Sequence, residues 1–354
     1  MLDFFQGLEG TVYWVVVLPA LFLGLTLLTF GGDWLADGAS SLAANFRIEP
    51  VVIGITVVSI ATSAPELFTC LIAGFRDQGD NLVLGNIAGS NLANVALILG
   101  VAGLISPIIG RPRYYFWEIP WLLLATIIFV LFCYGGITQF EGVALVLLMI
   151  SYLIVTLRLR PFFLSVLGPI YKKLGFIRDL AQVNIGNFDE LEEIEKRASS
   201  TAFFLVIGGT LFLLVGASLL VDSAQAIAIR LHINQGFIGL TVVAIGTSLP
   251  ELAASVAAAR KKQTGLIAGN IFGSNLFNML FVGGVTATAS PIEWDGSLKK
   301  ELFLMLAVTA FLTLVFRKKS SGHRQMGRAM GFIFITLYMS ILIYSAISLA
   351  PVVK

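Results

Sequence analysis

Apolar segments of about 20 residues recur along this chain and constrain its fold more than any other feature. A helix needs about 20 residues to cross the hydrocarbon core of a membrane. Hydrophobic residues make up 57% of the chain and charged residues only 12%, a balance that excludes soluble globular classes. The sequence therefore predicts an all-α integral membrane protein with ten transmembrane helices, at about 11–29, 50–74, 82–105, 116–135, 141–157, 201–221, 235–258, 265–288, 302–316 and 331–349.

Basic residues gather on one side of the membrane that these spans define. With the N-terminus outside, the inner segments hold 18 of the 23 Lys and Arg residues. The positive-inside rule then predicts a multi-pass protein of the plasma (inner) membrane with both termini outside. Residues 1–10 contain no Lys or Arg, so we expect the first span to be retained rather than cleaved as a signal peptide. The five outer basic residues are Arg76, Arg230, Lys299, Lys300 and Lys354.

The chain contains an internal duplication. ATSAPEL at 61–67 corresponds to GTSLPEL at 246–252 with an offset of 185 residues, and GNIAGSNLAN at 85–94 corresponds to GNIFGSNLFN at 269–278 with an offset of 184. Each copy carries five predicted spans, an odd number, so the second copy must enter the membrane from the opposite side. Inverted repeats of this kind are typical of secondary transporters, which bind substrate near the membrane midplane on broken helices.

The duplication predicts three segments: a first five-helix repeat at 1–159, a cytoplasmic linker at 160–198 and a second five-helix repeat at 199–354. The linker contains five acidic residues between Asp189 and Glu195. A calcium-binding loop would need a characteristic ligand spacing and a glycine that this stretch lacks. We interpret it as part of a solvated helix.

A proline and a glutamate interrupt one apolar span in each copy. Pro65 and Pro250 each remove a backbone N–H and crowd the carbonyl four residues earlier, which frees carbonyl oxygens in mid-span. Such backbone is tolerated at membrane depth only where protein packs it or where it lines a polar cavity. Glu66 and Glu251 follow a Thr by four residues and a Ser by three, so each carboxylate shares a helix face with both hydroxyls.

The two glutamates require a neutralising partner, because a charge in mid-membrane costs several kcal/mol. No Lys or Arg lies in the central part of the broken helices, which leaves bound cations or protons. Two carboxylates with backbone carbonyls form an all-oxygen ligand set that suits Ca²⁺, whereas softer metals favour Cys or His. The sequence thus predicts a cation site at Glu66 and Glu251.

The second motif adds side-chain oxygens at four-residue intervals. Ser90, Asn94, Ser274 and Asn278 lie deep along their helices and are candidate ligands. For the other amides, at Asn86, Asn91, Asn270 and Asn275, we favour hydrogen bonds that join helices. Small-xxx-small pairs, Gly85 with Gly89 and Gly269 with Gly273, predict close helix approach.

Other acidic residues near the span ends receive simpler interpretations. For Asp33, Asp37 and Asp222, helix capping or interfacial hydration explains an acid about as well as attraction of a cation does. Glu118 stands beside Trp117 in the sequence, and we expect it at the membrane interface.

With both motifs present in two copies, the sequence resembles the sodium/calcium exchanger family within the calcium/cation antiporter superfamily. The resemblance covers nearly the whole chain. It implies that Glu66 and Glu251 are the principal Ca²⁺ ligands. The further positions it implies are the carbonyls of Thr62 and Thr247 for Ca²⁺; Ser63, Ser248, Ser90 and Ser274 with the carbonyls of Ser59 and Ala244 for Na⁺; and Asn94 and Asn278 at the middle of the site.

The chain departs from the family pattern at two positions. Ala61 stands where the second copy has Gly246, a small loss of backbone freedom at the first break. Asn278 stands where many prokaryotic and potassium-dependent members have Asp. Because an amide adds no charge and does not titrate, Asn278 argues against a required K⁺.

The resemblance implies an antiporter that exchanges Na⁺ for Ca²⁺ by alternating access, extrudes Ca²⁺ and moves net charge. In this family the first and sixth helices slide past the others. We expect a protein that is not an enzyme, uses no cofactor, binds no nucleic acid and acts as a monomer in the lipid bilayer.

Two alternatives stay open at the level of sequence. A proton-coupled Ca²⁺ antiporter would use the same glutamates as proton carriers, although the abundant Ser and Asn ligands favour sodium. A passive cation channel would also need a charged pathway, although a duplicated, inverted site favours alternating access. An intramembrane protease is disfavoured because the spans contain neither an HExxH motif nor a suitable aspartate pair.

Overall fold

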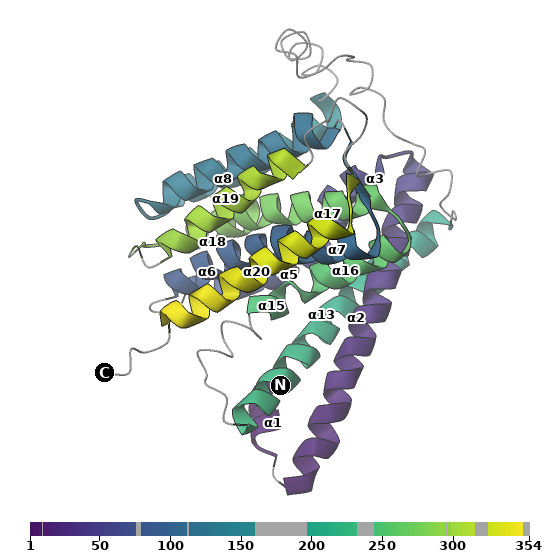
Figure 1. Cartoon of the computed structure of the whole chain (residues 1–354), viewed down its shortest axis with the longest axis vertical. Helices are drawn as coiled ribbons and strands as arrows, with labels where there is room; N and C mark the ends of the chain where they lie inside the picture. The colour runs from purple at the N-terminus through teal and green to yellow at the C-terminus, as the bar shows by residue number, and fades with distance from the viewer. Residues whose placement is uncertain are drawn as a thin grey trace.

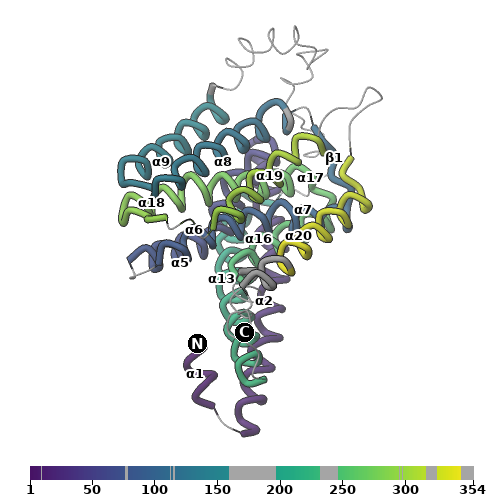
Figure 2. Tube along the Cα trace, turned by 60° about the vertical axis from the view of Figure 1, so that its left-hand side comes forward, coloured from purple at the N-terminus to yellow at the C-terminus, as the bar shows by residue number. Residues whose placement is uncertain are grey.

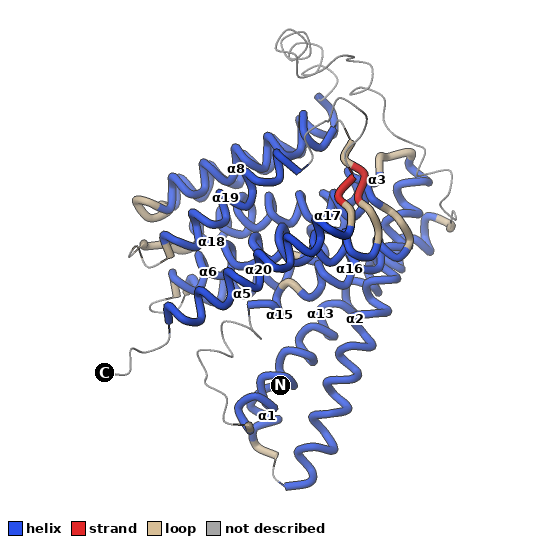
Figure 3. The backbone as a smooth tube through the Cα atoms, viewed as in Figure 1, coloured by secondary structure: helices blue, strands red, loops and turns tan. Residues whose placement is uncertain are grey.

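The computed structural model describes residues 1–8, 10–75, 79–111, 113–159, 197–231, 244–294, 296, 298–315 and 325–349, and these are mostly helical (Figures 1 and 3). The predicted linker at 160–198, except for its last two residues, and the first part of the span predicted at 235–258 lie outside the described residues.

In the first half of the chain, π-helical turns, labelled η, interrupt several helices. The elements are α1 (Leu2–Gln6), α2 (Gly10–Phe46), α3 (Pro50–Ile53), η1 (Gly54–Val58), α4 (Ser59–Thr62), α5 (Ala64–Gly74), α6 (Asp80–Leu92), η2 (Ala93–Ile98), α7 (Leu99–Ile105), β1 (Ile108–Ile109), η3 (Tyr114–Glu118), α8 (Ile119–Cys133), α9 (Gln139–Ile154) and η4 (Val155–Leu159).

The second half of the chain repeats much of this pattern. Its elements are α13 (Ser199–Arg230), α15 (Ala244–Thr247), α16 (Leu249–Arg260), α17 (Thr264–Leu276), η6 (Phe277–Val282), α18 (Gly283–Ala289), α19 (Lys299–Val315), β2 (Gln325–Met326) and α20 (Arg328–Leu349).

The described helices include six that are long and apolar enough to cross a membrane: Gly10–Phe46, Asp80–Ile105, Phe116–Cys133, Gln139–Arg158, Ser199–Arg230 and Thr264–Ala289. The bent pair Pro50–Thr62 and Ala64–Gly74 would make a seventh span, and Arg328–Ile343 is a shorter apolar helix. The chain is therefore an integral membrane protein with a helical fold. The full count of ten spans in two inverted repeats stays a prediction.

The two longest helices, α2 and α13, lie side by side and extend away from the other helices (Figures 1 and 2). A Cβ atom added to Gly31 would lie 2.8 Å from the Leu213 backbone nitrogen, and one added to Gly209 would lie 2.6 Å from that of Leu35. The contacts run in opposite chain directions, since Gly24 lies against Gly216. Gly24 and Gly31 correspond to Gly209 and Gly216 in the repeat, so the equivalent helices of the two copies pack antiparallel through equivalent glycines.

The prediction of close helix approach is confirmed for the second-copy glycines of the GNxxGSN motif and wrong for the first-copy pair, because a Cβ on Gly85 would lie 3.8 Å from Leu298 and one on Gly89 would meet no atom within 4 Å. A Cβ on Gly269 would collide with the Val51 carbonyl oxygen, and one on Gly273 with the Ser59 hydroxyl. Gly54 of η1 lies on the opposing surface. This contact brings the broken helix of the first copy against α17 of the second.

A small antiparallel sheet departs from the all-α expectation. β1 pairs with β2 through Ile108 opposite Met326 and Ile109 opposite Gln325 (Figure 3). The segment follows Ser106-Pro107, where the backbone leaves the helical region at Ser106 (φ −141°, ψ 135°). A residue before proline is disfavoured in helical conformation, so the chain continues as an extended strand.

A buried ion-pair network joins three helical segments and corrects the expected position of Glu118. The Glu118 side chain is fully buried rather than interfacial. It accepts a 2.6 Å hydrogen bond from the Arg113 Nε and a 2.5 Å bond from the Tyr152 hydroxyl, and Arg113 also pairs with Glu49 at 2.8 Å. Glu49 is the N-cap of α3, so the network connects the start of the broken helix to α8 and α9.

We expect Gly209→Ala to lower the free energy of unfolding by about 1–3 kcal/mol, because the added methyl meets backbone that cannot rotate away. Thermal unfolding in detergent micelles measures the effect. Gly7→Ala is the matched control, since its Cβ would make only ordinary 3.6 Å contacts. Equal stability of the two variants would contradict close packing at Gly209.

We expect Arg113→Met to lower the free energy of unfolding by about 3–5 kcal/mol, because it leaves the buried Glu118 without its cation. The same unfolding measurement applies. Arg158→Met is the control. It removes an exposed arginine in η4, just after α9, and should change the free energy of unfolding by less than about 0.5 kcal/mol. A small effect of Arg113→Met would show that water or another cation reaches Glu118.

Candidate ion-binding site

Both prolines break their helices at equivalent residues. α4 ends at Thr62, Ser63 adopts φ −84° and ψ 7°, and α5 begins at Ala64 with a bend of 47°. In the second copy α15 ends at Thr247, and Ser248 adopts φ −88° and ψ 6° before α16 begins. Proline suits the first turn of the new helix because no N–H is needed there.

The breaks place each glutamate at a favourable helix end. Glu66 lies in the first turn of α5 and Glu251 in the first turn of α16, where the helix dipole favours negative charge. Both side chains are almost completely buried, with 0% and 1% of the residue surface exposed. The structure thus concentrates two carboxylates in the interior of the helix bundle.

The carboxylates contact hydroxyls of the predicted ligand set. Ser63 donates a 3.1 Å hydrogen bond to the Glu251 Oε1, which links the break of one copy to the glutamate of the other. Ser90 on α6 donates a 3.4 Å bond to the Glu66 Oε1. Four of the predicted site residues therefore meet in two pairs.

An equivalent chain of hydrogen bonds supports each break. Thr62 donates to the Asn270 Oδ1 at 3.3 Å, and the Asn270 amide donates to Ser255 at 3.0 Å. In the other copy Thr247 donates to the Asn86 Oδ1 at 3.3 Å, and the Asn86 amide donates to the Cys70 sulfur at 3.3 Å.

Asn86 and Asn270 thus join helices, in agreement with their structural interpretation. Asn91 acts similarly, because its amide donates to the Asn275 carbonyl. Asn275 does not, because its side chain donates to the Ile271 carbonyl one turn earlier in α17 and so stays within its own helix.

Ser274 and Ser59 contact the same residue, Asn270, through its side chain and its backbone carbonyl respectively. Ser274 lies 3.5 Å from the Thr62 hydroxyl and 3.4 Å from the Asn270 Oδ1. Ser59 donates its hydroxyl to the Gly54 carbonyl at 2.8 Å and contacts the Asn270 carbonyl at 3.1 Å. Both residues therefore lie at the contact between α4 and α17, beside the break. Ala244 is the first residue of α15, one turn before the second break.

Asn94 and Asn278 lie in π-helical turns that the sequence analysis did not predict. η2 contains Asn94 and η6 contains Asn278, and both turns begin at the last two residues of the second motif, in the helix that carries it. An inserted π turn rotates the residues after it relative to a regular helix and often occurs at functional sites. The apolar stretches ANVALI and FNMLFV carry no proline or glycine that would signal such a turn. The only sequence feature that relates the two turns is the offset of 184 residues between the copies, which places Asn278 at the position equivalent to Asn94.

Several buried polar atoms of these residues have no hydrogen-bond partner in the part of the chain that the structure describes. They are Oε2 of Glu66 and of Glu251, both amide atoms of Asn94 and of Asn278, and the Ser248 hydroxyl. An unsatisfied buried polar atom costs about 1–3 kcal/mol, and more when it is charged. A cation bound among these oxygens would remove much of that cost.

The ligand chemistry is that of hard cations. Within the described residues, no group of three or more His, Cys, Asp and Glu side chains comes together. The site therefore offers two carboxylates with neutral oxygens, a set that suits Ca²⁺ or Na⁺ rather than softer metals. These features define a class of protein: membrane transporters that bind a small cation on broken helices.

The chain belongs to the sodium/calcium exchanger protein family. The model of that family matches residues 16–158 and 201–347. This match confirms the resemblance stated from the motifs. Membership makes the protein a cation antiporter of the calcium-exchanging kind.

Curated relatives span nearly the same length. The inner membrane protein YrbG of Escherichia coli (strain K12) is 32% identical over 314 residues, which cover 88% of this chain and 91% of the relative. The sodium/calcium exchanger MaX1 of Methanosarcina acetivorans is 28% identical, with coverages of 91% and 96%.

A solved structure has the same fold. The sodium-calcium exchanger NCX_Mj, in crystals soaked with Na⁺ and Sr²⁺, matches with a TM-score of 0.74 and 31% identity. The match covers 93% of this chain and 98% of that chain.

Proposed function

We propose that this protein exchanges Na⁺ for Ca²⁺ across a membrane by alternating access, with Glu66 and Glu251 as the shared carboxylates. The observation that carries the proposal is the set of buried oxygens at the two broken helices that have no hydrogen-bond partner among the described residues. Ser63, Ser90, Ser248, Ser274, Asn94 and Asn278, with the carbonyls of Ser59, Thr62, Ala244 and Thr247, complete the proposed ligand set.

Charge balance explains why the two cations exchange rather than bind together. One Ca²⁺ neutralises the two glutamates, whereas three Na⁺ would leave one net positive charge. Both loads use the same carboxylates, so occupancy is exclusive. If the site changes sides only when loaded, a sodium gradient drives Ca²⁺ in the opposite direction, outward in the cell. The cycle then moves net charge with a three-to-one stoichiometry.

We expect an outward sodium gradient to drive ⁴⁵Ca²⁺ into proteoliposomes, and Glu66→Gln or Glu251→Gln to reduce that flux at least about a hundredfold, because each change removes a charge that balances the ion. Asn275→Ser is the control: this side chain donates within α17, to the Ile271 carbonyl, and is not in the proposed ligand set, so the variant should retain most of the flux, provided it folds. Full flux in either glutamine variant would contradict the assignment.

The same vesicles separate the alternative functions. Uptake driven equally well by a pH gradient without sodium would indicate proton coupling. Calcium movement that persists without countertransport and does not saturate would indicate a channel.

Asn278 provides a second test, because it is neutral and sits at 0% exposure near the glutamates' helices. We expect K⁺ to leave wild-type exchange unchanged. Asn278→Asp adds a third carboxyl, so bound Ca²⁺ no longer balances the charge at neutral pH. Protonation of that carboxyl restores the balance, and the variant's exchange rate relative to wild type should rise as the pH falls. Rates measured at several pH values, with and without K⁺, test this. Stimulation of the wild type by K⁺ would contradict it.

Alternating access also requires a contact that forms on one side at a time, and Asp37 offers one. Its Oδ1 lies 2.6 Å from the Lys261 ammonium and its Oδ2 lies 3.3 Å from Arg197. Lys261 ends α16, the helix that carries Glu251, and also donates to the Asp33 carbonyl at 3.2 Å. Asp37 therefore ties the α2–α13 pair to the core at one end, where neither capping nor simple hydration describes it.

The equivalent acid of the second copy is engaged differently. Asp222 lies 3.9 Å from the terminal amine of Met1, which precedes α1, and 3.5 Å from the Ser218 hydroxyl of its own helix, α13. One acid thus contacts the core, and its counterpart contacts the N-terminus and its own helix. A cavity of about 170 Å³ separates α16 from the long helices along the contact, lined by residues that include Leu25, Leu220 and Val256. If α2 and α13 slide past the core, Asp37 would lose its contact with the core and Asp222 would gain one at the opposite end.

We expect Asp37→Asn and Lys261→Gln each to shift the balance between the two access states by about twofold to fivefold, since a partly exposed pair contributes about 0.5–1 kcal/mol. The apparent KM for Ca²⁺ should change in opposite directions on the two membrane sides. The effect of the double variant should be smaller than the sum of the two single effects, because both changes remove the same ion pair. Lys262→Gln, the exposed neighbour, is the control. Additive effects of the two changes would exclude this contact as the link.

A further inference from the structure

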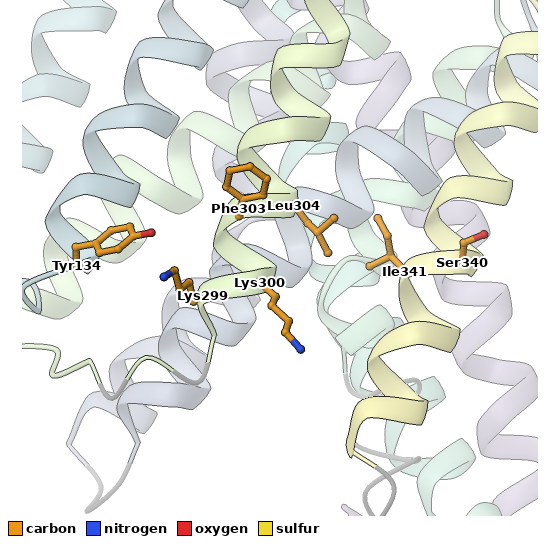
Figure 4. A pocket seen from close by; sticks show the side chains of 7 residues that line it. All are labelled: Tyr134, Lys299, Lys300, Phe303, Leu304, Ser340 and Ile341. Carbon is orange, nitrogen blue, oxygen red and sulfur yellow. The ribbon is translucent and has the colours of Figure 1, made fainter.

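A pocket of about 530 Å³ lies at the end of the helix bundle far from the Arg113 network, outside the ion site. It is formed where α8 ends, α19 begins and α20 passes (Figure 4). Its lining residues are Tyr134, Lys299, Lys300, Phe303, Leu304, Ser340 and Ile341. The lining combines apolar side chains with two ammonium groups and two hydroxyls, a mixture that suits an amphipathic ligand.

The pocket is apolar between α19 and α20 and basic where α19 begins. Leu304 and Ile341 face each other across the gap between α19 and α20 (Figure 4). Farther along the same two helices the rings of Phe311 and Phe334 are in contact, with centroids 5.6 Å apart. The helices therefore contact each other at these rings, about 10 Å or two helical turns from Leu304, and the pocket forms a crevice between them on the lysine side of that contact.

The two lysines stand at the mouth of this crevice as the first residues of α19. The Lys299 ammonium lies 5.9 Å from the centre of the Tyr134 ring, and both lysines are exposed. Positive charge at the start of a helix opposes the helix dipole, which favours anions at that position. Lys299 and Lys300 are also two of only five basic residues on the side that the positive-inside rule assigns to the exterior.

The surroundings of the crevice point to lipid. Phe303 is 67% exposed, Met339 48% and Ile343 56%, and these apolar side chains lie on α19 and α20 in a membrane protein. Lys and Arg pairs near the headgroup level attract anionic lipids. We propose that this pocket binds an anionic phospholipid, with its phosphate at Lys299 and Lys300 and an acyl chain between α19 and α20.

The hydroxyls complete the recognition of a headgroup. Tyr134 and Ser340 border the pocket from α8 and α20, on either side of the lysines (Figure 4). The Tyr134 hydroxyl can donate a hydrogen bond to a phosphate oxygen, whereas the Ser340 hydroxyl donates to the Thr336 carbonyl at 2.8 Å and can accept one from a glycerol hydroxyl. A lipid held there joins α8, α19 and α20, of which α19 and α20 touch through Phe311 and Phe334.

The test measures lipid bound to the purified full chain, without any ion gradient, so it is independent of the proposed exchange function. Native mass spectrometry of the detergent-solubilised protein, titrated with phosphatidylglycerol or phosphatidylcholine, gives the two affinities. We expect phosphatidylglycerol to bind at least about tenfold more tightly. Lys299→Gln and Lys300→Gln should each weaken it roughly fivefold.

Two further variants keep the test decisive. Ser340→Trp adds bulk to the pocket from an exposed position and should exclude phosphatidylglycerol while both lysines are retained. Lys262→Gln removes an exposed lysine at the other end of the molecule and should change binding less than twofold. Unfolding midpoints show whether each variant is folded. If Ser340→Trp does not fold, the lysine variants decide the test, and if the lysine variants do not fold, Ser340→Trp decides it.

Three outcomes would overturn the proposal. The first is equal affinity for the two lipids, or an equal effect of Lys262→Gln and Lys299→Gln. The second is full displacement of the lipid by inorganic phosphate, which would indicate an anion site without an acyl chain. The third is a dimer that Ser340→Trp disrupts in the absence of lipid, which would indicate that a second copy covers the pocket.

Discussion

Two carboxylates buried without a basic partner are the constraint on which the rest of this structure depends. Glu66 and Glu251 are removed from water by the surrounding helices, and one oxygen of each has no hydrogen-bond partner in the described part of the chain. The Arg113 cluster shows the opposite arrangement, because Glu49 and Glu118 there share a buried arginine. In the Arg113 cluster the protein itself supplies a cation to the buried carboxylates. Among the described residues Glu66 and Glu251 have no such cation, and we propose that a transported ion takes that place.

The repeated halves are equivalent in backbone and unequal in contacts. Both copies have a break at a Ser-x-Pro-Glu sequence, a Thr-to-Asn hydrogen bond beside it and a π turn in the following span. Ser63 nevertheless donates to a glutamate, whereas the equivalent Ser248 hydroxyl has no partner among the described residues. Asp37 and Asp222 differ in the same way. Two nearly equal halves held in different contacts are what a transporter with two access states requires.

Much of the site could be predicted because its signals are local. Proline at position 65 breaks the helix within one turn of its own position. Gly269 and Gly273 lack a side chain, so another helix can approach the backbone there. The membrane class and the antiporter family also followed from the sequence. Glu118 was misplaced because its neighbour Trp117 suggested an interface, while the partner that buries it, Tyr152, lies 34 residues away. The π turns had no local signal. Ser106-Pro107 marked the end of a helix, but the pairing of β1 with β2 joins distant segments and had no local signal either.

The amino-acid sequence, taken alone, specified the apolar spans, their duplication and the residue types at each break, because hydrophobicity and proline geometry act over a few residues. Tertiary structure decided which oxygens meet. Ser63 and Glu251 are 188 residues apart, and Asp37 and Lys261 are 224 apart. No periodicity within one helix encodes such pairs. They form because α4 packs on α17 through glycines and α2 lies along α16, and the register of those contacts exists only in the folded bundle.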